Sequence, residues 1–304
     1  MKYKNMFGCF PGKLKMFNNM KTYHLKVILI SLLCIGSVGH LYPQSEAKDS
    51  TFHPYHINYW VTGSILTVGA TTNLLGISKI LNKPEVTLTE IEALNKGIIN
   101  NLEQWAIEQD PVSREAFANY SDVTLISSIP LPGLLLFDKN IRRDKYDLLL
   151  MYLETMSITT NIFEWSFLGP TFQNRLRPVT YYNQLTYEEK KSGNNRNSFY
   201  SGHVASVAAS TFFMAKVYSD YNPNIGNNKY FLYAAAAIPP LVLGYFRIKA
   251  LKHFPSDVMV GIAIGALCGI IIPELHRIQS EKVFLGMYSS IEGMGLSLKW
   301  KPDF

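Results

Sequence analysis

Cysteine and charge are both scarce in this sequence. Its 304 residues include only three cysteines, Cys9, Cys34 and Cys268, which lie far apart and mostly in apolar runs. Such spacing gives neither a disulfide framework nor a metal-binding motif. Charged residues make up 17% of the chain, and the net charge is a modest +6. Without a basic patch on a recognisable reader module, the sequence argues against a nucleic-acid-binding protein.

Apolar residues are abundant and gather into long runs. Hydrophobic residues make up 47% of the chain and the mean hydropathy is +0.03, between a soluble enzyme and a pure membrane bundle. A membrane helix needs about 20 apolar residues. We interpret six runs as candidate spans, at residues 57–81, 121–137, 146–169, 203–219, 230–248 and 257–275. They predict an all-α integral membrane bundle of about six helices.

The last run carries a pattern of small residues. Gly261, Gly265 and Gly269 repeat every fourth residue in a stretch without charge. In a membrane, small residues at this spacing allow two helices to pack closely. The alternative is a glycine-rich helix buried in a soluble core.

The N-terminal region has the composition of a targeting segment. Residues 1–26 contain six lysines and no acidic residue, and an apolar run follows over residues 27–38. We interpret residues 1–41 as a signal peptide or an N-terminal anchor. If this segment is cleaved, a span at 57–81 would invert the topology that follows. Either residues 1–41 stay attached as an anchor, or 57–81 lies in the membrane interface.

Residues 42–119 are predicted to hold the first hydrophobic segment and an outer amphipathic loop. Thr89 and Glu92 have the spacing of a capping box. After them, apolar residues recur at helical spacing and predict one amphipathic helix; they are Ile91, Leu94, Ile98, Leu102 and Trp105.

Three short segments contain the residues suited to catalysis: Arg175 to Pro178, Ser198 to His203, and Arg247 to Asp257. Arginines bind phosphate oxygens through a bidentate fork. A Ser-Gly turn that opens a helix offers backbone N–H groups to the same oxygens. One histidine can attack phosphorus while the other protonates the leaving oxygen. These residue types predict phosphoryl transfer without a metal or another cofactor.

The three segments resemble the motifs of the type 2 phosphatidic acid phosphatase (PAP2) superfamily, in its membrane lipid phosphatase branch. The family pattern is Lys-x6-Arg-Pro, then Pro-Ser-Gly-His, then Ser-Arg-x5-His-x3-Asp. The resemblance covers roughly residues 120 to 275. Three positions depart from it: Pro170 replaces the lysine, Tyr200 the proline and Phe246 the serine.

The resemblance implies a role for each matching residue. His253 would be the nucleophile, Asp257 would orient it, and His203 would be the general acid. The phosphate would be bound by Arg177, Arg247, Ser201 and Gly202. The charge of the absent lysine would come from Arg175, Lys249 or Lys252, and we expect Arg175 because it is nearest in the sequence.

Two acidic residues lie inside the apolar run at 146–169. Ionisable groups at this depth indicate function or a specific partner. We expect Glu164 to pair with an arginine of the first motif, and Glu154 to hydrogen-bond a neighbouring helix.

The resemblance predicts the reaction and its location. Residues 120–276 would form a phosphatase domain, followed by a tail at 277–304. The substrate would be a phosphorylated membrane lipid: phosphatidic acid, phosphatidylglycerol phosphate, undecaprenyl diphosphate or lipid A. Basic residues at 138–145 predict a cytoplasmic loop. The motifs would then face the periplasm from a bacterial inner membrane.

Two other interpretations stay open. A vanadium haloperoxidase would use the same residues to hold vanadate, with His253 as the metal ligand. Alternatively, the protein binds a phosphorylated lipid without hydrolysing it, because the motif-one lysine is absent.

Overall fold

The computed structural model describes residues 53–278 and the backbone of two strands at 283–290 and 293–300. The described residues all belong to one compact unit. The segment predicted as a signal peptide or anchor, residues 1–41, lies outside the described residues.

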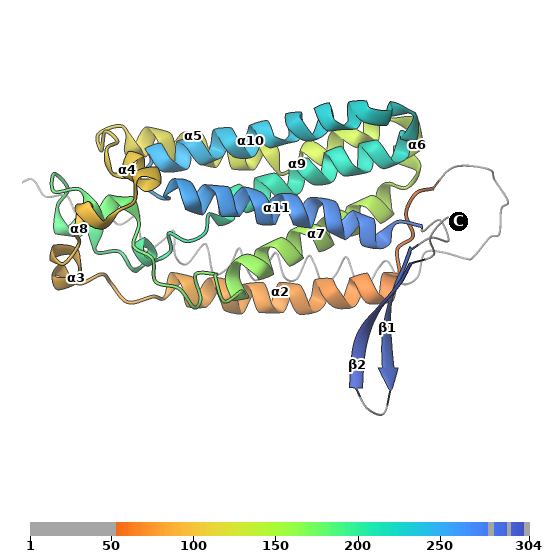
Figure 1. Ribbon diagram of the computed structural model, residues 1–304, viewed down its shortest axis with the longest axis horizontal. Helices are drawn as coiled ribbons and strands as arrows, with labels where there is room; N and C mark the ends of the chain where they lie inside the picture. The colour runs from red at the N-terminus through yellow and green to blue at the C-terminus, as the bar shows by residue number, and fades with distance from the viewer. Residues whose placement is uncertain (1–52, 279–282, 291–292, 301–304) are drawn as a thin grey trace, which may run out of the picture. The chain divides into compact units, whose positions relative to one another are not determined.

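Six long helical segments make up the bundle (Figure 1). They are α2 (Tyr59–Leu81), α5 (Arg114–Ser128) with its 3-10 extension η2 (Leu131–Phe137), α7 (Lys145–Trp165), α9 (Gly202–Tyr221), α10 (Lys229–Lys249) and α11 (Pro255–His276). All six predicted runs coincide with these helices, which confirms the membrane bundle. Short helices connect them: α3 (Leu88–Glu92), α4 (Asn101–Ile107), α6 (Lys139–Arg143) and α8 (Tyr187–Lys190).

Four segments of the described chain are long and apolar enough to cross a membrane: α2, α5 with η2, α10 and α11. Helices α7 and α9 complete the bundle, but their sequences are not apolar enough to meet the same criterion. Most of α9 is buried against its neighbours, including Val204, Val207 and Phe213. Because little of α9 would face lipid, its sequence can be less apolar than that of an outer helix.

Helices α9 and α11 pack closely through the glycine repeat. A Cβ atom at Gly261 would lie 2.7 Å from the carbonyl oxygen of Ser201, and one at Gly269 would lie 2.6 Å from that of Ala209. Any larger residue would separate the helices, so the predicted close-packing face is confirmed. This contact sets the first turn of α11 against the first turn of α9.

Helix α2 is a member of the bundle. The Tyr59 hydroxyl donates to Asp147 Oδ1 at 2.6 Å, near the start of α7. Further along, the Trp165 indole donates to the carbonyl of Thr72 at 3.0 Å. Both helices therefore begin at the end of the bundle that carries α6 (Figure 1), and α2 packs along α7.

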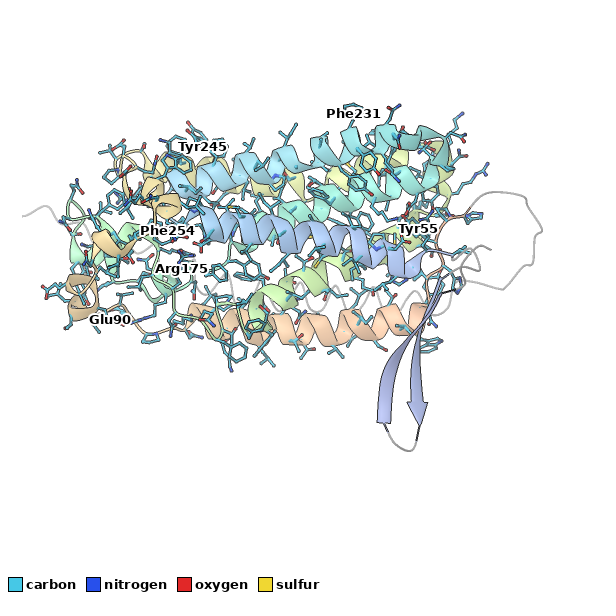
Figure 2. The ribbon with its side chains drawn as sticks, in the orientation of Figure 1. Tyr55, Glu90, Arg175, Phe231, Tyr245 and Phe254 are labelled. Carbon is cyan, nitrogen blue, oxygen red and sulfur yellow. The ribbon has the colours of Figure 1, made fainter. Side chains whose placement is uncertain are left out.

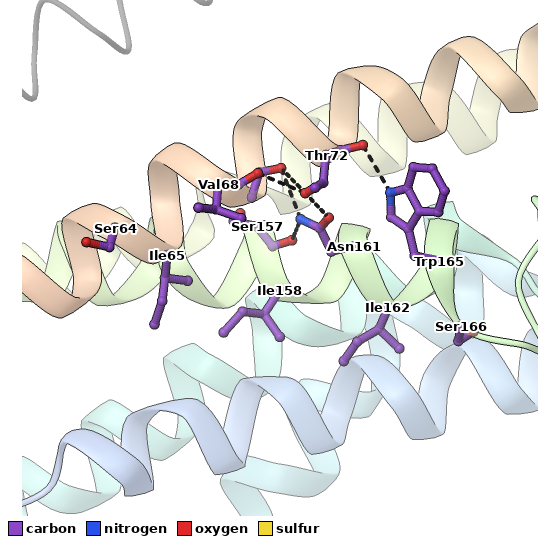
Figure 3. A pocket seen from close by; sticks show the side chains of 11 residues that line it. Ser64, Ile65, Val68, Thr72, Ser157, Ile158, Asn161, Ile162, Trp165 and Ser166 are labelled. Atoms are coloured by element: carbon purple, nitrogen blue, oxygen red, sulfur yellow. Dashed lines mark hydrogen bonds between the residues drawn. The ribbon is translucent and has the colours of Figure 1, made fainter. Parts of the chain in front are cut away.

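Helices α2 and α7 also line a pocket of about 640 Å³. Figure 3 shows Asn161 on its wall, where this side chain accepts a hydrogen bond from Thr72 Oγ1 at 2.5 Å and donates one to the Gly69 carbonyl at 3.1 Å. None of the three motifs contributes a lining residue. The pocket is therefore separate from the motif residues.

The prediction of a single amphipathic helix through Ile91 and Trp105 is wrong. The capping box is formed by Thr87 and Glu90, and α3 ends at Glu92. Asn95 and Asn100 then cap two further short helices, η1 (Lys96–Ile98) and α4. Asparagine side chains compete for backbone N–H groups in this way, which divides the apolar stripe among three elements.

The predicted tail contains a β-hairpin. Strand β1 (Val283–Ser290) pairs antiparallel with β2 (Gly293–Trp300), with Val283 opposite Trp300. The remaining residues of 279–304 lie outside the described part.

Candidate active site

The three motifs meet at the end of the bundle opposite α6, where α9 and α11 begin and α10 ends (Figure 1). Backbone hydrogen bonds join them. The Ser198 N–H donates to the Arg175 carbonyl at 3.0 Å, and the Ser201 N–H donates to the Asp257 carbonyl at 3.1 Å. Figure 2 labels Arg175 beside Phe254, whose ring lies 4.5 Å from the guanidinium carbon.

His253 is buried, with 2% of its surface exposed. Its Nδ1 lies 2.6 Å from the carbonyl oxygen of Ser198. A carbonyl oxygen can only accept, so Nδ1 carries the proton and Nε2 keeps its lone pair. Burial, followed by the charges of Arg247 and Arg177, holds the pKa of His253 well below its ordinary value. The ring is therefore neutral near pH 7, with Nε2 unprotonated and 3.4 Å from an Arg247 nitrogen.

The connection between α10 and α11 sets this position. Leu251 is buried and has a φ of 57°, in the left-handed region that side chains other than glycine seldom adopt. Its carbonyl accepts a hydrogen bond from the Val179 N–H at 3.2 Å. This tight turn reverses the chain and returns His253 to Arg247 at the end of α10. Such backbone conformations are concentrated at functional sites.

Asp257 does not hold the His253 ring directly. Its Oδ2 lies 3.8 Å from Nδ1, beyond hydrogen-bonding distance. That oxygen instead accepts from the Ser198 hydroxyl at 2.6 Å and from the Phe254 N–H at 2.7 Å. Asp257 therefore fixes the segment whose carbonyl orients His253. The sequence assigned no role to Ser198, since a backbone carbonyl leaves no trace in residue type.

Arg175 is engaged by acidic residues. It pairs with Asp257 at 2.5 Å and with Glu103 of α4, and Ser256 also contacts Glu103. Two carboxylates neutralise its charge, so the expectation that Arg175 replaces the motif-one lysine is not supported by its contacts. Glu103 was missed from the sequence, because it lies in a loop helix far from the motifs.

Arg177 and Arg247 lie in the site, and each has an N–H group that donates no hydrogen bond within the described residues. Both are buried, and the Nε of each has no hydrogen-bond partner among residues 53–278. The same holds for the buried hydroxyl of Ser201. Burial and the nearby Arg247 lower the pKa of Arg177 to about 9. Buried donors and positive charge without acceptors are suited to an oxyanion.

Gly202 and His203 form the first turn of α9. A Cβ atom at Gly202 would lie 3.0 Å from the ring of Phe163, so glycine allows this helix start to approach α7. The N–H groups of the first turn have no partner within a helix and favour an anion. His203 is partly buried and interacts electrostatically with Arg247 and His253.

Two departures from the family motifs serve packing. Tyr200 is fully buried, with its ring 5.5 Å from that of Phe163. Phe246 joins an aromatic cluster, 6.0 Å from Phe117 and 5.8 Å from Tyr120. Both side chains therefore pack against neighbouring aromatic rings and add no charge.

The two acidic residues of α7 differ from each other. Glu154 lies 3.1 Å from the His276 ring of α11, as expected for a bond to a neighbouring helix. Glu164 pairs with no arginine: it packs against Gly76 of α2, and its Oε2 has no partner among the described residues. Within the described part of the chain, no group of three or more histidine, cysteine or acidic side chains could hold a metal ion.

Comparison with known proteins agrees with the motifs. Residues 148–280 match the family model of the PAP2 superfamily. The fold has a similarity to the first transmembrane PAP2 type phosphatidylglycerolphosphate phosphatase from Bacillus subtilis, with 17% identity over 70% of this chain and 94% of that chain and a TM-score of 0.40. No curated protein matches the sequence. The family match includes all three motifs, so residues 148–280 have the sequence of a PAP2-type phosphatase domain.

Proposed function

We propose that this protein hydrolyses a phosphomonoester or diphosphate of a membrane lipid through a phosphohistidine on His253, without a metal. The observation that carries the proposal is the unprotonated Nε2 of His253 beside Arg247, in a buried group of unpaired donors. A neutral imidazole in that position is a nucleophile, and the donors are suited to the charge of a phosphoryl group.

The proposed steps use the residues gathered at the site. Arg177, Arg247, Ser201 and the first N–H groups of α9 bind the non-bridging oxygens. His253 Nε2 attacks phosphorus as the bond to the leaving oxygen breaks, and His203 gives that oxygen its proton. His203 then accepts a proton from water, whose oxygen attacks the phosphohistidine. Phosphate leaves, and both histidines return to their starting states.

The location of the site supports a lipid substrate. It lies at the ends of α10 and α11, both apolar enough to cross a membrane. A head group can occupy such a site while its hydrocarbon chains stay in the bilayer. The basic residues of 138–145 lie at the opposite end, with α6 (Figure 1). The positive-inside tendency therefore favours a site on the outer, periplasmic face of a bacterial inner membrane.

The test is phosphate release by the full chain, purified in detergent, in the presence of EDTA. The panel contains phosphatidic acid, phosphatidylglycerol phosphate, undecaprenyl diphosphate and lipid A. His253→Ala removes the nucleophile, and His56→Ala is the matched control, since His56 is exposed near the start of α2. Acid-labile, alkali-stable label on the wild-type protein would identify phosphohistidine.

EDTA-resistant release that is lost only in His253→Ala is the expected result, and the panel then identifies the substrate. Release that needs a metal, or that survives in His253→Ala, contradicts the proposed mechanism. If the folded protein binds these lipids but releases no phosphate from them, the binding protein is favoured instead.

A further inference from the structure

The site lacks the cation that the family places in motif one. Pro170 occupies that position and is buried. Arg175 is neutralised by Glu103 and Asp257. Neither residue can offer a free positive charge to a phosphate.

The Lys249 ammonium contacts aromatic rings rather than the residues of the site. Its ammonium lies over the rings of Phe117 and Tyr245, 5.7 and 6.0 Å from their centroids. Cation–π contacts of this kind hold a lysine against the aromatic surface. Of the three basic residues considered from the sequence, this leaves Lys252.

Lys252 lies between the buried residues Leu251 and His253, and its backbone N–H donates to the Arg247 carbonyl at 3.0 Å. Its side chain makes no hydrogen bond or ion pair with any residue of the described chain, although it interacts electrostatically with His203 and His253. The hydrogen-bonded backbone thus fixes the start of a half-buried, unpaired lysine side chain immediately before His253.

The surrounding charges do not balance this cation. Burial, followed by Arg177, Arg247 and Arg114, lowers the pKa of Lys252 to about 8, and Asp122 is the acid that opposes this. Asp122 is 56% exposed and lies 3.9 Å from Arg247, so its charge is shared and screened. Arg177 and Arg247 are buried and Lys252 is half-buried, and a group of cations with so little compensation is suited to an anion.

We propose that Lys252 replaces the motif-one lysine and contacts a non-bridging oxygen of the bound phosphate. The third motif would then supply the cation that the first has lost, immediately before the nucleophile. This inference rests on the proposed function for its role in turnover, while phosphate binding can be measured without turnover.

The experiment compares Lys252→Met with Lys252→Arg and with Lys249→Met, the matched control that removes a lysine of the same turn. Binding of inorganic phosphate to the full chain in detergent is measured by calorimetry, and kcat/KM is measured on the best lipid of the panel. A charge-assisted contact to phosphate predicts a ~10- to 100-fold loss of phosphate affinity and of kcat/KM in Lys252→Met. Lys252→Arg should retain most of both, and Lys249→Met should match the wild type.

Equal phosphate affinity in Lys252→Met and wild type, or equal losses in Lys249→Met, would overturn the inference, as would failure of the wild type to bind phosphate. The melting temperature of each variant identifies a folding defect, and Lys252→Arg then decides. If the wild type binds phosphate but hydrolyses no lipid, the proposed function fails while the binding comparison still decides the role of Lys252.

Discussion

His253 and Ser198 are joined by a short hydrogen bond, with 2.6 Å between the imidazole Nδ1 and the carbonyl oxygen. The carboxylate of Asp257, four residues beyond the histidine, lies 3.8 Å from the same nitrogen. The backbone of the second motif therefore orients His253 of the third, the residue proposed as the nucleophile, and Asp257 acts on the ring through Ser198.

Asp257→Asn should lower kcat by ~10- to 100-fold and leave phosphate affinity within a few-fold. An asparagine can accept both the Ser198 hydroxyl and the Phe254 N–H on its one carbonyl oxygen only by turning its NH2 group toward the Arg175 guanidinium, where two donors face each other. Either these bonds or the Arg175 pair is lost, so the Ser198 carbonyl loses its fixed position. Ser198→Ala removes only one of these bonds and should have a smaller effect in the same direction. Steady-state kinetics and phosphate binding check both variants. A rise in KM at constant kcat would instead place Asp257 in substrate binding.

Glu103→Gln should destabilise the protein by about 1–3 kcal/mol, because it leaves a partly buried arginine without one of its two carboxylates. The kcat/KM of the folded protein should change by only a few-fold, because Glu103 contacts Arg175 and Ser256 rather than the residues proposed to bind phosphate. Thermal unfolding in detergent measures the change. Glu108→Gln is the control, because Glu108 is exposed and directly follows the last residue of α4. This variant should unfold at the same temperature as the wild type. Equal melting temperatures for the two variants would contradict the structural role.

The pH profile of kcat/KM should keep its acid limb below pH 6.5. Protonation of His253 removes the nucleophilic lone pair, and its lowered pKa means that this protonation occurs only below the ordinary histidine value. Activity therefore persists as the pH falls to that range and is lost beneath it. An acid limb above pH 6.5 would show that His253 is not the neutral, buried group described.

An alkaline limb near pH 8 is expected when Lys252 loses its charge, since the pKa of this lysine is lowered to about 8. Lys252→Arg should move that limb to higher pH, because a guanidinium stays charged. If the limb does not move, it belongs to a group other than Lys252.

Gly261→Ala should abolish most activity by separating α9 from α11. The added Cβ would lie 2.7 Å from the Ser201 carbonyl oxygen, closer than the two atoms can approach, so the first turns of the two helices must shift. Displacements of this kind at a catalytic site can cost ~100-fold in rate. Gly63→Ala in α2 is the matched control, since nothing lies within 4 Å of its Cβ, and it should remain active. Equal activity in both variants would contradict the packing argument.

Patterns of neighbouring residues in the sequence were enough to predict the helices, the close-packing face of α11 and the residues of the site. Runs of apolar residues mark the long helices of this bundle, so all six were predictable with their approximate bounds, and four of them are apolar enough to cross a membrane. The glycine repeat identified the close-packing face of α11, because a spacing of four places residues on one side of a helix. The motif spacings likewise indicated which residues gather at the site.

Only the tertiary structure decided how the charges are shared. Arg175 forms an ion pair with Glu103 of α4, and His253 donates a hydrogen bond to a backbone carbonyl. Lys252 follows the buried turn at Leu251 and pairs with no acidic residue of the described chain. Neutralisation of a charge depends on which distant groups folding brings within a few ångströms, whereas residue type and spacing describe only neighbours along the chain.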